Sequence, residues 1–382
     1  MVHRMVWNQT AYFGPGAINE IPGELKARGF TKTLIVTDKA LVENGVINPV
    51  TKLLDDAGIA YDIFDNVAPN PPIENVQAGV AHFQHSGADV LIGTGGGSPL
   101  DTAKAIGIIV ANPEFADVRS LEGGAATKHP SIPIIAVPTT AGTASETTIN
   151  YVITDTENRR KFVCFDPHDI PVLAIVDPNM MATAPRSLKV ATGLDALTHA
   201  IEGYITAGAW ELSDMFHLKA IQIIASSLLA AANGDAAAMD RMSLGQYIAG
   251  MGYSNVGLGI VHAMAHPLGA FYDAPHGVAN GVLLAPVMRF NAEATGEKYR
   301  DIAAAFGIDT SAMSLDEARA AACDAVANLT RELGNPTTIS SLGATEADIA
   351  ALAQAAHDDV CAGGNPRPAS VAELADLYRS LL

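Results

Sequence analysis

The sequence contains few cysteines, and they lie far apart. Of its 382 residues only three are cysteine, Cys164, Cys323 and Cys361, and no two of them form a Cys-x-x-Cys pair. This spacing excludes a disulfide framework and is typical of proteins in a reducing compartment, so we expect a cytoplasmic protein.

The chain is also poor in positive charge. It has 23 lysines and arginines against 41 acidic residues, which gives a formal net charge of −18 at pH 7. Nucleic acids and anionic membranes both attract proteins through basic surfaces. The sequence therefore predicts no nucleic-acid partner and no membrane partner.

Long apolar runs are missing as well. The most apolar helical stretch, residues 221–232, is interrupted by Ser226 and Ser227 and predicts a core helix rather than a membrane span. The first ten residues, MVHRMVWNQT, lack the apolar stretch of a signal peptide. With 49% hydrophobic and 17% charged residues, the composition is that of a globular protein with a large core.

The first half of the chain alternates short β-branched runs with helical patterns. We predict one helix near residues 49–57, a second that begins at residue 72, and a third that follows residues 95–99 and ends near residue 110. We predict strands at residues 33–37, 61–64, 89–93, 132–137 and 173–176. This alternation predicts parallel βαβ units in a doubly wound sheet. Residues 5–13 precede the first unit and predict an extra edge segment, which a second subunit can pair with.

The second half of the chain has a different sequence pattern, because strand-like runs disappear after about Pro185. Long Ala- and Leu-rich helical patterns follow, and capping boxes predict helix starts at Ser314, Thr345 and Ser370. We therefore predict an α/β domain over residues 1–184 and an all-helical domain over residues 185–382.

Three histidines lie in residues 259–277, which read GIVHAMAHPLGAFYDAPHG. His262 and His266 are four residues apart and share one face of a helix. Pro267, Gly269 and residues 275–277 are expected to end the helical periodicity, so that His276 lies on a loop or at a new helix start.

Asp195 and His199 repeat the four-residue spacing. Any one of these histidines alone is more readily a core or surface residue. Two pairs at helical spacing together with His276 favour the donor set of a divalent metal site. Nitrogen and oxygen donors do not distinguish Fe(II) from Zn(II).

A glycine run stands between a predicted strand and a predicted helix. Residues 95–98 read GGGS, in the place where a backbone approaches a diphosphate and offers its N–H groups. The usual G-x-G-x-x-G fingerprint of dinucleotide-binding proteins is absent.

Asp38 follows the first predicted strand and is a second sign of a dinucleotide. A carboxylate in that position accepts hydrogen bonds from the adenosine ribose and repels a 2′-phosphate, so it favours NAD over NADP. A helix N-cap explains Asp38 equally well. Thr139, Thr140 and Thr143 follow the fourth strand and suit ribose and phosphate contacts, or simply an ordinary polar turn.

Together these features resemble the iron-dependent (group III) alcohol dehydrogenase family, from the first strand to the C-terminus. The stretches that carry the resemblance are residues 112–123, 148–155, 159–171, 191–206, 245–280 and 358–367. Within the family the longer stretches are most similar to the lactaldehyde reductase branch. The resemblance implies a dehydroquinate synthase-like fold, with an N-terminal NAD-binding domain, a C-terminal metal-binding domain and the active site between them.

The resemblance also implies roles for individual residues. His266 is a candidate for proton transfer, and the metal, normally Fe(II), is held by Asp195, His199, His262 and His276. The cofactor positions are Asp38, Asn70, Gly96, Gly97, Ser98, Thr139, Thr140, Thr143, Val152 and Lys161. The substrate positions are Asn150, Tyr253 and Cys361, where Tyr253 departs from the phenylalanine expected at its position.

The implied activity is NAD(H)-linked interconversion of lactaldehyde and 1,2-propanediol by hydride transfer, in a dimer formed through an N-terminal strand. Other group III dehydrogenases, acting on 1,3-propanediol, butanol or methanol, are the main alternative. A lyase on the same fold would need many basic side chains for a phosphorylated substrate, and this chain has few. A non-catalytic assembly protein would be expected to lose the metal donors, and all four are present.

Two of the implied positions have plain alternatives. Cys361 is expected to line the cleft or fill space rather than act as a nucleophile, because no motif pairs it with a base. Lys161 is either a cation near the cofactor or a solvated charge.

Overall fold

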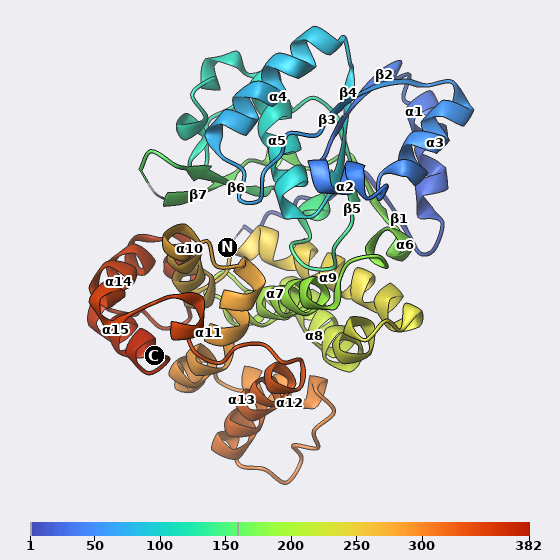
Figure 1. Ribbon diagram of the computed structural model, residues 1–382. Coiled ribbons are helices and arrows are strands. Elements are labelled where there is room, and N and C mark those ends of the chain that lie inside the picture. The colour runs from blue at the N-terminus through green and yellow to red at the C-terminus, as the bar shows by residue number, and fades with distance from the viewer. Residues whose placement is uncertain (1, 159) are drawn as a thin grey trace. The chain divides into compact units, whose positions relative to one another are not determined.

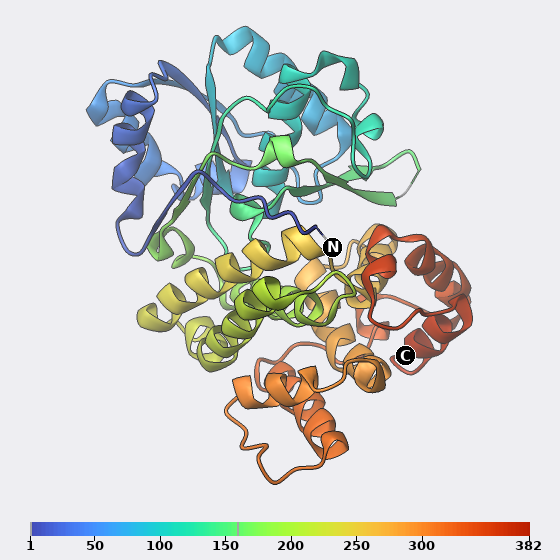
Figure 2. The same cartoon turned by 180° about the vertical axis from the view of Figure 1, so that it is seen from behind.

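The computed structural model describes residues 2–158 and 160–382. The chain folds into two compact units, one ending at Ala184 and the other beginning at Pro185. Figures 1 and 2 show the ribbon from opposite sides, with the first unit in blue to green and the second in green to red.

Six strands of the first unit form one parallel sheet, as the alternating pattern predicts. Its order is β1-β8-β5-β4-β2-β3. The strands are β1 (Thr10–Phe13), β2 (Lys32–Val36), β3 (Ala60–Phe64), β4 (Val90–Gly95), β5 (Ile134–Pro138) and β8 (Leu173–Val176). From β2 the chain moves to β3 on one side and then to β4, β5 and β8 on the other. The winding direction therefore reverses between β2 and β4, the place where doubly wound folds bind their ligands.

Helices cover both faces of this sheet. Figure 1 shows α1 (Ile21–Ala27) and α3 (Asn48–Ala57) on one face, and α4 (Ile73–Ser86) and α5 (Gly97–Ala111) on the other. Side chains of β2 alternate between the two cores, since Ile35 packs in the cluster of α1 and α3 while Leu34 and Val36 pack in that of α4 and α5. Burial on both faces explains why the strands read as continuous apolar runs. The remaining short helices of this unit are α2 (Lys39–Glu43) and α6 (Pro178–Met181).

An antiparallel hairpin was not predicted from the sequence. It consists of β6 (Asn150–Asp155) and β7 (Arg160–Phe165). Only alternate residues of β6 are buried, including Tyr151 and Ile153, which pack in a cluster with residues of α5. Such a short half-polar pattern is easily missed, because periodicity in a few residues is weak evidence for a strand.

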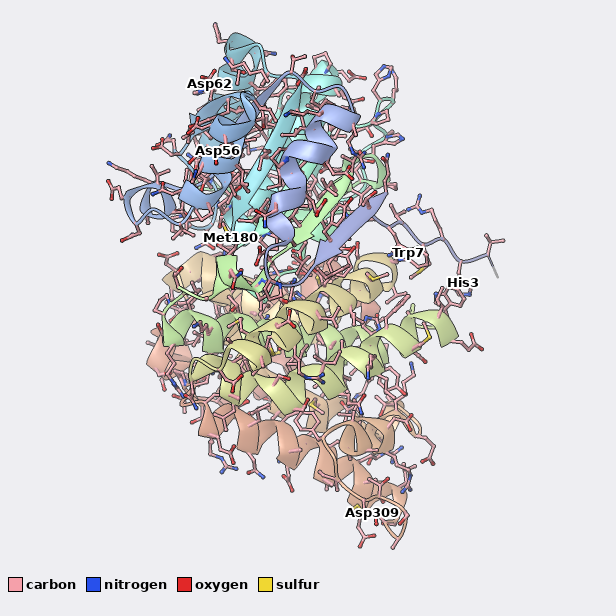
Figure 3. All side chains as sticks on the ribbon, turned by 90° about the vertical axis from the view of Figure 1, so that its right-hand side faces the viewer. His3, Trp7, Asp56, Asp62, Met180 and Asp309 are labelled. Atoms are coloured by element: carbon pink, nitrogen blue, oxygen red, sulfur yellow. The ribbon has the colours of Figure 1, made fainter. Side chains whose placement is uncertain are left out.

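The edge segment is shorter than residues 5–13. Only Thr10–Phe13 form β1, which pairs with β8 on one side and has its other edge unpaired within the sheet. Figure 3 labels Trp7 and His3 on the segment before β1, which runs away from the sheet edge. The side chains of Trp7 and Phe13 are 43% and 47% exposed, so this end of the chain presents aromatic surface.

The second unit contains helices and no strand over residues 185–382, all of which are described. Its helices are α7 (Arg186–Ile205), α8 (Glu211–Ala232), α9 (Ala236–Val256), α10 (Ile260–Tyr272), α11 (His276–Asn291), α12 (Lys298–Ala305), α13 (Leu315–Glu332), α14 (Ile349–Asp358) and α15 (Val371–Arg379). Both sides of the predicted capping boxes form at Ser314, Thr345 and Ser370. They start α13, a 3₁₀ turn before α14, and α15.

Helix α8 is long and apolar enough to cross a membrane by length and composition alone, and half of its apolar window is buried. It packs against α7, where Leu228 covers Gly193, and against α9, where Ile223 and Ile224 cover Gly245. These contacts are those of a core helix, as residues 221–232 predict.

The prediction that Pro267 and Gly269 end the helix of His262 and His266 is wrong. Helix α10 continues through both residues to Tyr272 and is followed by Asp273 in the left-handed conformation. A proline inside a helix removes one hydrogen bond, but the fully buried neighbours Met264 and Leu268 pack this helix into the unit and offset the loss. His276 is the first residue of α11, as predicted.

Helices α7 and α11 are in close contact at Gly277. A Cβ atom added there would lie 2.0 Å from the carbonyl oxygen of Ala191, a backbone atom that cannot rotate away. We expect Gly277→Ala to destabilise the protein by about 1–3 kcal/mol, because the two helices must separate. The midpoint of thermal unfolding should fall by several degrees.

Gly23→Ala in α1 is the matched control, since a Cβ at Gly23 meets nothing within 4 Å. Alanine in that helix should be neutral or slightly stabilising. Equal midpoints for the two variants would contradict the close helix contact.

Candidate functional site

Four predicted metal donors come together in the second unit. Asp195 and His199 lie one turn apart on α7, His262 is in the first turn of α10, and His276 begins α11. The Oδ1 atom of Asp195 is 3.5 Å from Nε2 of His276 and 3.9 Å from Nε2 of both His262 and His199. Donor atoms of Asp195, His262 and His276 all lie within 4.8 Å of one another.

His199 stands slightly apart from this group of three and is held by stacking. Its ring lies 4.6 Å from that of His262 and 4.2 Å from that of Tyr253, at interplanar angles of 22° and 10°. Tyr253, a predicted substrate residue, is thus in contact with a predicted metal donor and is 8% exposed.

The residues fit a divalent metal by their chemistry. Two ligands about 2.1 Å from one ion at a tetrahedral angle lie about 3.4 Å apart, close to the separations found here. Burial lowers the pKa of His262 well below its usual value, so its imidazole is neutral, the form that binds metals. Burial also raises the pKa of Asp195, while His199 and a hydrogen bond from Asn280 act against this shift. A buried carboxylate beside several imidazole nitrogens is suited to a cation.

Two residues of this site were missed from the sequence. Asn280 donates from Nδ2 to Oδ1 of Asp195 over 2.8 Å, and the same nitrogen lies 3.3 Å and 3.2 Å from Nε2 of His262 and His276. Glu202 lies 2.5 Å from Nδ1 of His262 through Oε2. Helical spacing was the available signal, because Asn280 is four residues after His276 and Glu202 is three after His199.

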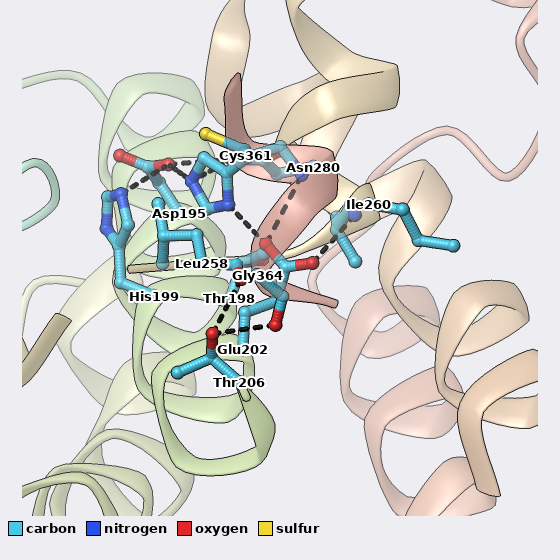
Figure 4. A network of polar contacts seen from close by, with 12 residues as sticks. Asp195, Thr198, His199, Glu202, Thr206, Leu258, Ile260, Asn280, Cys361 and Gly364 are labelled. Atoms are coloured by element: carbon cyan, nitrogen blue, oxygen red, sulfur yellow. Dashed lines mark hydrogen bonds and ion pairs between the residues drawn. The ribbon is translucent and has the colours of Figure 1, made fainter. Parts of the chain in front are cut away.

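Figure 4 draws this polar network, with Asp195, His199 and Glu202 extending from α7. Glu202 is 2% exposed. Burial by itself raises the pKa of its carboxyl group, and hydrogen bonds from the N–H groups of Val261 and His262 act against this shift.

His266 belongs to a second cluster beside the first. Its ring stacks on that of His276 with centroids 5.4 Å apart, and its Nδ1 lies 2.7 Å from Oδ2 of Asp359. The other carboxylate oxygen, Oδ1, accepts a hydrogen bond of 2.8 Å from the backbone N–H of Cys361. Burial by itself would raise the pKa of Asp359, but His266 holds it below its usual value.

Asp359 was not predicted, because it is 93 residues from His266 and no local pattern joins them. Cys361 is half-buried, and burial raises the pKa of its thiol well above the usual value. A protonated thiol agrees with a packing role and is a poor nucleophile.

The predicted cofactor residues lie in the first unit, most of them at the carboxyl ends of three neighbouring strands. Asp38 follows β2, Gly96, Gly97 and Ser98 follow β4, and Thr139, Thr140 and Thr143 follow β5. The N–H of Thr139 donates to the carbonyl of Gly95 over 2.8 Å, and a Cβ at Gly97 would lie 2.9 Å from Cγ2 of Thr143. The glycine loop and the threonine loop therefore form one surface around the start of α5.

Asp38 is a helix N-cap, the alternative left open by the sequence. Its Oδ1 accepts a hydrogen bond of 2.9 Å from the N–H of Leu41 in α2. The cap uses one carboxylate oxygen, so the residue keeps a second oxygen at the point where the winding direction reverses.

Two residues of α5 that were not predicted, the half-buried Asp101 and the buried Lys104, hold the hairpin that carries Asn150, Val152 and Lys161. Asp101 accepts the N–H of Val152 over 3.0 Å, and Nζ of Lys104 donates to the carbonyl of Asn150 over 2.8 Å. Burial lowers the pKa of Lys104 to about 8, and nearby carboxylates, Asp101 first, act against this shift. Lys161 in β7 donates to Oδ1 of Asn70 over 2.7 Å, so it is paired rather than only solvated.

Models of one protein family match both units of the chain. The model of the iron-containing alcohol dehydrogenase family matches residues 8–178, and that of the Fe-containing alcohol dehydrogenase family, C-terminal, matches residues 189–382. Lactaldehyde reductase of Escherichia coli (strain K12) is 60% identical over 380 residues, which cover 100% of both chains. The 1,3-propanediol dehydrogenase of Citrobacter freundii is 41% identical over 372 residues, 96% of each chain.

A crystal structure of 1,3-propanediol oxidoreductase superposes on this chain with a TM-score of 0.97, at 39% identity and with 100% of both chains covered. Family models match nearly the whole sequence, and the fold is shared over its full length. The chain therefore belongs to the iron-containing alcohol dehydrogenase family.

Proposed function

We propose that this protein is a cytoplasmic, Fe(II)-dependent oxidoreductase that interconverts lactaldehyde and 1,2-propanediol with NAD(H). The observation that carries the proposal is the group of donor atoms from the buried Asp195 and His262 and the half-buried His276, with His199 beside it. The 60% identity to a lactaldehyde reductase over the whole chain supports the substrate.

Asp195, His199, His262 and His276 would hold the metal in this proposal. When bound, the metal supplies Lewis acidity and the nicotinamide supplies the hydride chemistry. The donor set suits both metals and by intrinsic affinity favours Zn(II) over Fe(II), so the choice of iron rests on the family.

His266 is assigned to proton transfer. Its Nδ1 faces Asp359, which holds the ring in one orientation and leaves Nε2 to exchange a proton with the substrate oxygen. Tyr253, Asn150 and Cys361 are the proposed substrate positions.

The cofactor is assigned to the carboxyl edge of the sheet. Backbone N–H groups of Gly97 and Ser98 at the start of α5 suit the diphosphate. The loop that carries Thr139, Thr140 and Thr143 lies beside them and is assigned to the same cofactor. Asp38 suits the adenosine ribose. The rest of the cofactor is assigned to Asn70, Val152 and Lys161.

A homodimer through β1 is part of the proposal. The strand has one unpaired edge within the sheet, and such an edge is suited to pairing with another chain.

The substrate and the metal are tested together by anaerobic turnover of metal-stripped protein. We expect Fe(II) to restore NADH oxidation with lactaldehyde and NAD reduction with 1,2-propanediol. The reason is that a cation held by these four residues would polarise the substrate oxygen. Absorbance of the nicotinamide measures both directions. Higher kcat/KM with 1,3-propanediol, butanol or methanol would replace the substrate, and no net NADH change with any alcohol would favour a lyase.

Substitutions at His266 and Asp359 test the proton-transfer assignment. His266→Ala should lower kcat by about 10²-fold or more, since positioned proton transfer contributes that much. Asp359→Asn should lower kcat by about 10-fold, because an amide cannot hold the same imidazole orientation. Metal content, measured on both proteins, should stay at the wild-type level.

Asp358→Asn is the control for the neighbouring position, since Asp358 is exposed and bonds to Gln354. Its kcat should equal that of the wild type. Loss of metal from His266→Ala would instead make His266 a ligand.

Cofactor preference is tested at Asp38 without disturbing the helix. Asparagine is as good an N-cap as aspartate but carries no charge. Asp38→Asn should therefore keep the midpoint of thermal unfolding. The ratio of kcat/KM with NADH to kcat/KM with NADPH should fall by about 10-fold, because the repulsion of the 2′-phosphate is removed.

Asp38→Ala should change the preference and also lose the cap, at a cost of about 1 kcal/mol. An unchanged preference in both variants would leave Asp38 with the capping role alone.

A further inference from the structure

A buried carboxylate joins the proposed metal site to the start of a helix. Glu202 lies on α7 seven residues after Asp195, on the same helix face, and is 2% exposed. It is not one of the four proposed donors.

Glu202 caps helix α10 from a distance. Gly259, the N-cap residue, has no side chain to offer, and Glu202 accepts the N–H of Val261 over 2.7 Å and that of His262 over 3.3 Å. A Cβ at Gly259 would lie 2.8 Å from Oε1 of Glu202, so the glycine permits this approach. A carboxylate at the N-terminus of a helix is stabilised by the free N–H groups there.

The same carboxylate meets the side chain of His262. Its Oε2 atom lies 2.5 Å from Nδ1, while Nε2 of the ring lies on the side of Asp195, 3.9 Å from Oδ1. In a neutral imidazole only one nitrogen carries a proton. The N–H groups of Val261 and His262 both point at this side chain and stabilise its ionised form against burial. A carboxylate that accepts at Nδ1 keeps the proton of the ring there and leaves the lone pair of Nε2 for a metal.

We propose that Glu202 is a positioning residue that fixes the tautomer and the orientation of His262 and thereby raises the affinity of the site for its metal. The inference rests on the proposed metal site. One side chain, Glu202, thus caps the beginning of α10 and also orients the donor atom of His262 that this helix supplies.

Glu202→Gln separates the two roles. The amide oxygen of glutamine can still accept an N–H bond at the start of α10, but its NH₂ group facing Nδ1 favours the tautomer with the proton on Nε2. Glu211→Gln, an exposed acid in the first turn of α8, is the matched control for loss of one charge.

The experiment uses metal-stripped, full-length protein titrated with Co(II), whose visible absorption reports coordination, and with Zn(II) in competition. We expect Glu202→Gln to raise the Kd for both ions by 10- to 100-fold, the usual effect of removing a partner of a metal-ligating histidine. Its metal-free thermal midpoint should stay near that of the wild type, and Glu211→Gln should match the wild type in both measurements.

Three outcomes separate the possible failures. Wild-type protein that does not bind Co(II) would overturn the metal site itself. Wild-type binding with an unchanged Kd in Glu202→Gln would overturn the role of Glu202 alone. A fall in affinity matched by a fall in the metal-free midpoint would reduce Glu202 to a helix cap.

A measurement on the wild type keeps the inference testable if Glu202→Gln does not fold. The nitrogen chemical shifts of ¹⁵N-histidine-labelled, metal-free protein report the tautomer of each ring, and His262→Gln identifies the signal of His262. A proton on Nδ1 is expected. A proton on Nε2 would mean that Glu202 donates to the ring, and would overturn the inference.

Discussion

The second unit depends on the burial of two carboxylates on one face of helix α7. Asp195 and Glu202 are both 2% exposed. A buried carboxylate is costly by several kcal/mol unless donors or cations surround it. Asp195 therefore needs Asn280 and the imidazoles, and Glu202 needs the start of α10. Meeting both needs fixes α10 and α11 against α7.

Small residues make these polar contacts possible. Gly259 and Gly277 stand at the starts of α10 and α11, where a side chain would strike Glu202 or the backbone of α7. The helices approach closely enough for short side chains to reach one another. The donor atoms are thus placed by helix packing, and rigid elements hold a site more sharply than loops do.

The first unit uses a similar arrangement for a different purpose. The half-buried Asp101 and the buried Lys104 lie near each other on α5 and bond to the hairpin. Asp101 also binds the turn before the hairpin, since it accepts the hydroxyl of Ser145 over 2.7 Å. The helix that begins at the glycine loop therefore also anchors the segment that carries Asn150 and Val152. A pair of opposite charges holds this junction in place where neither charge alone would be tolerated.

Local pattern determined much of this protein. The alternation of strands and helices, the glycine run between β4 and α5, and the spacing of His262 and His266 are readable because periodicity is a property of neighbouring residues. Resemblance to a family added the metal and cofactor roles. Pro267 was misread, because buried contacts of α10 outweigh the hydrogen bond that a proline removes.

Tertiary structure alone decided which side chains meet. Asp359 reaches His266 across 93 residues, and Glu202 reaches His262 across 60. The hairpin of β6 and β7 likewise depends on packing against α5. A sequence records which groups lie on a common face, but their partners are selected by the packing of whole helices, and the burial of polar groups then determines which contacts must form.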